Sequence, residues 1–155
     1  MNRLATIAVL ILTAAEAVGA GERPASEPYI PGLGEFMSAT QVRHAKLWFA
    51  GNARNWELAA FELDEIKEGL GDAARVHPTH EGVPVADMIK ANLDAPLADL
   101  AKVIEAKDAS GFSRAFDRLT AGCNACHMAA AHAFIRIQRP TAPPVSNQIF
   151  APGSK

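Results

Sequence analysis

The sequence has little of what β-rich, nucleic-acid-binding or disulfide-rich proteins contain. Its 155 residues include one Tyr, two Trp and seven Phe, and Val and Ile seldom alternate with polar residues, which argues against a β architecture. The 15 Lys and Arg residues are balanced by 17 Asp and Glu residues and form no basic cluster, so nucleic acid is not an expected partner. Only two Cys residues are present, and a chain of this length can bury a core without disulfides. We therefore expect one mostly helical domain.

The first 20 residues differ from the rest of the chain and have the pattern of an export signal. Arg3 gives a short positive region, residues 5–15 are almost wholly apolar, and residues 18–20 are the small residues of a cleavage site. The apolar run is shorter than the ~20 residues that a permanent anchor needs, although an uncleaved anchor is the alternative. We predict a signal peptide at 1–20, a flexible linker at 21–32, no membrane anchor after cleavage, and a periplasmic protein.

Four stretches of the chain show apolar residues at the three- and four-residue spacing that marks one face of a helix. The first two predict helices over 33–51 and 56–71, each ended by a glycine. The other two predict helices over 85–104 and 112–139. Each helix has only one apolar stripe to bury, and four such stripes are buried most simply against one another. The fold class is therefore predicted to be all-α, with an antiparallel four-helix bundle over 33–139.

The segments between and after these helices carry turn signals. Residues 72–84 include two Pro, one Gly and two His without an apolar period, so we expect one long loop there. Pro96 lies inside the third helix and predicts a kink, unless Asp94 caps a new helix. Three further prolines follow Pro140, and we expect residues 140–155 to form an extended, Pro-rich tail.

Cys123-Asn124-Ala125-Cys126-His127 is a C-x-x-C-H motif, and its spacing suits covalent attachment of haem c. Two thiols three positions apart on a helix share a face, so both can form thioethers to the two vinyl groups on one edge of a porphyrin. The next side chain reaches under the ring, where an imidazole can bind iron while its other nitrogen makes a second-shell hydrogen bond. We predict one covalent haem c on Cys123 and Cys126, with His127 as the proximal iron ligand.

Three other interpretations of the two cysteines fit less well. A thioredoxin-type dithiol lies at a helix N-terminus after a strand, whereas this pair lies deep in a helical stripe. A disulfide between residues i and i+3 of one helix is strained. Structural zinc needs four nitrogen or sulfur ligands, and the remaining candidates are scattered: His44, His77, His80 and His132. His77 and His80 share the long loop, but two histidines make a weak metal site, so we expect them to be loop residues.

Met37 and His44 are the candidates for the distal iron ligand. They are seven residues apart on the first helix, nearly two turns, so both point the same way. We take the first and fourth helices as antiparallel neighbours that meet at Gly51 and Phe112. His127 then lies ~22 Å from that end, Met37 ~21 Å and His44 only ~10 Å. Met37 is therefore the predicted distal ligand, with His44 as the alternative, and an inward histidine or a core methionine needs no such role.

With an export signal, four helices and one C-x-x-C-H motif in the last helix, the chain resembles the class II c-type cytochromes over roughly Leu33 to Arg139. This group contains cytochrome c′ and the low-spin cytochrome c556 proteins. The resemblance implies a cytochrome c′-like bundle with the haem inside it, near the C-terminal helix. It also implies a methionine of the first helix, here Met37, as the second axial ligand of low-spin members. High-spin members leave the sixth position open and bind small gases.

These features predict a periplasmic monohaem c-type cytochrome that exchanges electrons with redox partner proteins. The alternative is a gas-binding or sensing haem protein, whose sixth position is open or whose ligand is displaced by nitric oxide or carbon monoxide. Beyond the motif we find no constellation of acid, base and nucleophile, so we do not expect an enzyme. Some relatives pair into homodimers, and the resemblance leaves that state open here.

Overall fold

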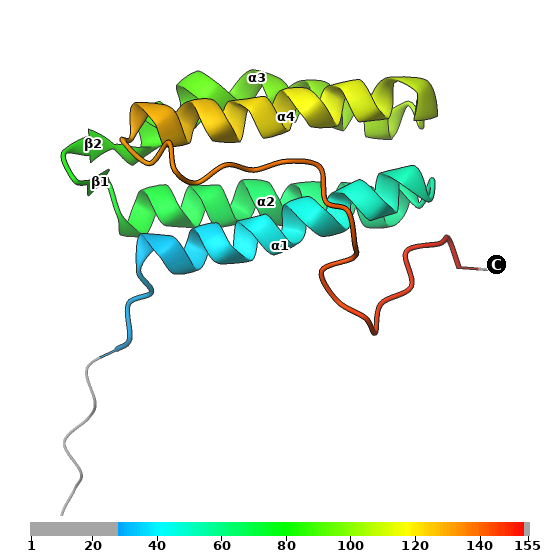
Figure 1. The fold of residues 1–155 in the computed structure, drawn as a ribbon, viewed down its shortest axis with the longest axis horizontal. Helices are drawn as coiled ribbons and strands as arrows, with labels where there is room; N and C mark the ends of the chain where they lie inside the picture. The colour runs from blue at the N-terminus through cyan, green and yellow to red at the C-terminus, as the bar shows by residue number, and fades with distance from the viewer. Residues whose placement is uncertain (1–27, 154–155) are drawn as a thin grey trace, which may run out of the picture.

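The computed structural model describes residues 28–153, which are mostly helical. The helices are α1 (Leu33–Asn52), α2 (Trp56–Val76), α3 (Val85–Glu105) and α4 (Ala109–Ala129). A small antiparallel hairpin of β1 (Thr79–His80) and β2 (Val83–Pro84) joins α2 to α3. The helices lie side by side, α1 against α2 and α3 against α4 (Figure 1). The predicted class is confirmed at this level, a mostly helical chain with four helices in its described part.

The predicted N-terminal signal and most of the linker lie outside the described residues, so the structure says nothing about them. Within residues 28–153, no helix combines the length and the apolar character that a membrane span requires.

Local capping explains where α2 and α4 begin. The Asn55 side chain accepts a hydrogen bond from the backbone N–H of Leu58 (3.2 Å), as its place before the second apolar stripe predicts. Asp108 does the same for α4, because its carboxylate accepts from the N–H groups of Ser110 and Gly111, both at 3.0 Å. These caps satisfy N–H groups that have no partner inside the helix.

The predicted ends of the second and fourth helices were wrong, and the alternative of a new helix at Asp94 is excluded. α2 continues past Gly71 to Val76, because its apolar face continues to the buried Ala73. The expected loop at 72–84 is therefore half helix, and its remainder is the hairpin. α3 runs unbroken through Pro96, so no new helix begins at Asp94. α4 ends well before Pro140, and the chain leaves the helix near Ala131, whose φ of 60° is left-handed.

The aromatic core lies at the end of the molecule away from the hairpin. Phe112 and Phe116 are at most 1 % exposed, and the Trp48 ring packs 4.9 Å from the Phe116 ring. A methyl group at Gly51 would overlap the Phe112 ring, so α1 and α4 meet at these two residues, as the sequence analysis assumed. Large rings thus fill this half of the interior, and the other half is left to smaller side chains.

Candidate functional site

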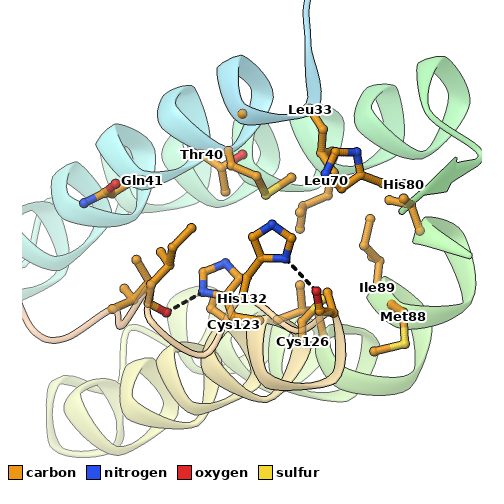
Figure 2. Close-up of a pocket in the computed structure, with 18 of the residues that line it drawn as sticks. Leu33, Thr40, Gln41, Leu70, His80, Met88, Ile89, Cys123, Cys126 and His132 are labelled. Carbon is orange, nitrogen blue, oxygen red and sulfur yellow. Dashed lines mark hydrogen bonds between the residues drawn. The ribbon is translucent and has the colours of Figure 1, made fainter. Parts of the chain in front are cut away.

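A cavity of about 420 Å³ opens at the hairpin end of the helices. All four helices, the hairpin and the segment after α4 contribute to its walls, which are mainly apolar. Figure 2 shows Cys123 and Cys126 on the α4 side and Thr40 and Gln41 on the α1 side. Every residue predicted to hold the haem lines this one cavity: Met37, His44, Cys123, Cys126 and His127.

A buried hydrogen bond sets the register of α1 against α4. His44 Nε2 lies 2.9 Å from Thr120 Oγ1, and the Thr120 hydroxyl donates to the Phe116 carbonyl at 3.0 Å. Because that hydroxyl proton is already used, Nε2–H of His44 must be the donor in the first bond. Met37 precedes His44 by seven residues and His127 follows Thr120 by seven. In helices that run in opposite directions, Met37 and His127 therefore lie at the same level, ~10 Å beyond this bond.

His44 is a neutral residue of the interior. Its side chain is buried against the Phe116 ring, with ring centroids 4.4 Å apart and 4 % of the residue exposed. Burial lowers the pKa of His44 from 6.5 to about 4, because a positive charge is unfavourable among apolar side chains. The bond to Thr120 occupies Nε2, so only Nδ1 of His44 could bind an iron ion.

The two cysteines are free thiols on the face of α4 that lines the cavity. Burial raises the pKa of the Cys123 thiol to about 11, and burial also raises the pKa of Cys126. Reactive dithiols depend on a lowered thiol pKa, which a helix N-terminus or a nearby cation provides. Here both thiols lie near the C-terminal end of α4. This setting disfavours a thioredoxin-type redox pair.

The imidazole of His127 is held by the segment that follows α4. Its Nδ1 lies 3.0 Å from the carbonyl oxygen of Ile135, so Nδ1–H donates and Nε2 keeps its lone pair. This is the second-shell partner that the sequence analysis required without placing it. The tautomer leaves Nε2 available to bind a metal.

Asn124 holds that segment in place. Its Nδ2 donates to the Ile137 carbonyl at 2.9 Å, and its Oδ1 accepts from the Ile137 N–H at 2.8 Å. Asn124 lies between the two cysteines of the motif, and Ile137 is two residues beyond Ile135. The motif therefore positions its own second shell. The sequence analysis missed this because it extended the fourth helix to residue 139, which would keep Ile137 in the helix.

Two histidines outside the motif also line the cavity. His80 reaches it from β1 and His132 from the segment after α4 (Figure 2). The sequence analysis expected His80 to be a loop residue, and it lies in the two-residue strand β1 on the cavity wall. His77, at the end of α2, instead contacts the segment before α1, because its Nε2 lies 2.8 Å from the Pro31 carbonyl. The sequence carried no signal for His80, since its neighbour His132 is 52 positions away.

No family model, curated protein or solved structure matches this chain. The resemblance to class II c-type cytochromes therefore stays a prediction that depends on the C-x-x-C-H motif and the four helices.

The residues present fit a covalent haem. The cavity volume lies in the range of ~300–1,000 Å³ that is usual for cofactor pockets, and its walls are mainly apolar. Both thiols needed for thioethers and the imidazole needed for iron line the same cavity. His127 has the tautomer that a proximal ligand requires, and the thioether of Met37 lines the cavity at the level of His127.

Proposed function

We propose that this protein is a periplasmic monohaem c-type cytochrome that transfers electrons, with the antiparallel four-helix bundle of the cytochrome c′ kind. One observation supports it above all: Cys123, Cys126 and His127 line a single apolar cavity, and the Ile135 carbonyl leaves Nε2 of His127 free. A bound haem would supply reversible one-electron chemistry at its iron. No substrate is needed, and the partners are other redox proteins, so the protein is not an enzyme.

Each residue of the site has a separate task in this proposal. Cys123 and Cys126 attach the cofactor, and His127 binds the iron. The Ile135 carbonyl orients the imidazole of His127 and raises its basicity as a ligand. The apolar walls from α2 and α3 would keep water away from the haem, and this lower dielectric would influence its reduction potential.

Met37 is the proposed sixth ligand, in preference to His44. Register places Met37 at the level of His127, and a thioether ligand raises the potential of a haem. His44 lies about 10 Å further along α1 and one of its ring nitrogens is bonded to Thr120. If Met37 is displaced by nitric oxide or carbon monoxide, the protein is a gas-binding or sensing protein instead.

Mass spectrometry of protein exported from a host that matures c-type cytochromes tests the attachment. The expected mass is that of the chain without residues 1–20, plus one haem. Cys123→Ala and Cys126→Ala should each lose the normal two-thioether product. A wild-type mass without haem, or normal attachment in both variants, would overturn the proposal.

Optical spectra of the purified protein test the sixth ligand. Met37→Ala should change a low-spin spectrum to a high-spin one, whereas Met88→Ala, a change to another methionine of the cavity wall, should leave it low-spin. Carbon monoxide should not bind the reduced wild-type protein. Ready binding of carbon monoxide would favour the gas-binding alternative, and an unchanged spectrum in Met37→Ala would exclude Met37 as the ligand.

A further inference from the structure

A second group of metal-binding side chains lies beside the cavity, apart from the haem motif. It consists of His80 on β1, Glu81 in the hairpin turn and His132 after α4. One ligand atom from each lies within 4.8 Å of the others, and the two imidazole rings are 5.9 Å apart. His80 and His132 are half-buried on the cavity wall, whereas Glu81 is exposed. The group therefore lies where the cavity meets solvent.

The backbone fixes both segments that carry this group. In the hairpin, His80 pairs with Val83, so Glu81 and Gly82 form a two-residue turn with φ values of 50° and 82°. Ala131, just before His132, has a φ of 60°. L side chains rarely adopt this left-handed conformation. The left-handed residues Glu81 and Ala131 therefore fix the course of the hairpin and of the segment after α4, which are far apart in the sequence.

A backbone carbonyl orients the ring of His132. Its Nδ1 lies 2.6 Å from the Ala130 carbonyl, so Nδ1–H donates and Nε2 carries a free lone pair. A backbone carbonyl on the second ring nitrogen is the usual partner of a metal-binding histidine. By contrast, Nε2 of the nearby His77 is engaged by the Pro31 carbonyl.

We propose that His80, Glu81 and His132 bind a divalent transition-metal ion of the zinc type. Two imidazoles and one carboxylate form a set that zinc binds with a fourth position left for water, and imidazoles disfavour magnesium and calcium. Two donors on one zinc ion can lie at most ~4.4 Å apart, twice the longest bond. The ligand atoms of the three residues lie within 4.8 Å of one another, close to this limit.

The ion would link the α2–α3 hairpin to the segment after α4. That segment also carries Ile135, whose carbonyl holds His127. The site does not depend on the proposed haem, because none of its three ligands belongs to the C-x-x-C-H motif. Free thiols, however, also bind zinc, so the experiment must remove them as donors.

Calorimetric titration with Zn²⁺ tests the site in two preparations, the haem-loaded protein and the haem-free double variant Cys123→Ala/Cys126→Ala. Each should bind one ion. In both, His80→Ala and His132→Ala should weaken binding at least about tenfold, whereas His77→Ala, a change to a histidine outside the group, should change the affinity less than about twofold.

Cobalt(II) provides the second measurement, because its spectrum reports the ligand atoms. Because neither preparation contains a free thiol, the bound ion should show the visible d–d bands of a site with nitrogen and oxygen ligands. Equal weakening by His77→Ala and His80→Ala, or binding that is absent once the thiols are removed or blocked, would overturn the site. Circular dichroism checks that the double variant is folded, and the haem-loaded protein tests the site if that variant is not. Zinc binding without haem attachment would leave this site standing while the proposed function fails.

Discussion

Replacing His44 by leucine should remove a defined part of the acid sensitivity of this protein. Burial lowers the pKa of His44 to about 4, whereas the same side chain in the unfolded chain titrates near 6.5. Between these values the unfolded chain binds a proton that the folded protein does not. The contribution of neutral His44 to the free energy of unfolding is therefore complete above about pH 6.5, and it is lost as the pH falls toward about 4.

The size of the effect follows from this difference in pKa. A difference of about 2.5 units corresponds to about 3 kcal/mol over the whole window, of which about 2 kcal/mol is lost by about pH 5. With a urea dependence of about 2 kcal/mol per M, the midpoint of unfolding should fall by about 1 M between pH 7 and about pH 5. The carboxylates also lower the urea midpoint at acid pH, in both the wild type and His44→Leu. The difference between the two proteins therefore measures the part of the fall that comes from His44.

Urea unfolding followed by helical circular dichroism measures both proteins at the two pH values. His77→Leu is the matched control, because it makes the same substitution at a histidine that is only half-buried. If His44→Leu loses as much stability between the two pH values as the wild type does, His44 is not held neutral by the fold.

Three further substitutions test the packing around the site by urea unfolding. Gly51→Ala should destabilise the protein by about 1–3 kcal/mol, because the added methyl overlaps the Phe112 ring. Gly71→Ala, with nothing within 4 Å of its new methyl in the interior of α2, should instead stabilise it by about 0.5–1 kcal/mol. If both changes have the same sign, the contact of α1 with α4 is not as described. Asn124→Ala should cost about 1–2 kcal/mol, because both hydrogen bonds to Ile137 are lost; no loss would mean that this clamp does not hold the segment.

The sequence predicted the parts of the fold that depend on local pattern. The starts of the helices followed from apolar spacing and from capping residues such as Asn55, whose side chain does cap α2. The meeting of Gly51 with Phe112 was assumed in the sequence analysis, and the structure bears the assumption out. With this alignment, helix rise alone puts Met37 and His127 at one level.

The helix ends after Gly71 and Ala129 could not be predicted in the same way. A glycine ends a helix only where no further burial is gained, and Ala73 of α2 is fully buried. At the other end, the apolar spacing continues to Phe134, yet 79 % of that residue is exposed. Where α4 stops depends on the bonds that the next segment makes back to Asn124, and these are tertiary contacts. Consequently the sequence alone could not predict the hydrogen-bond partner of His127 or the neighbours of His132.

Contacts of α4 with α3 and with α1 explain why the cavity lies at the hairpin end of the molecule. Pro96 has no N–H to donate to the Asn92 carbonyl, and that oxygen lies 2.5 Å from where a Cβ of Gly122 would stand. α3 and α4 therefore approach closely just before Cys123. On the other side of α4, the bond between His44 and Thr120 closes the gap to α1, and the rings of Phe112 and Phe116 fill the space beyond it. The space that remains at the hairpin end is the cavity that the two thiols and the imidazole line, and it is where the proposed haem would lie.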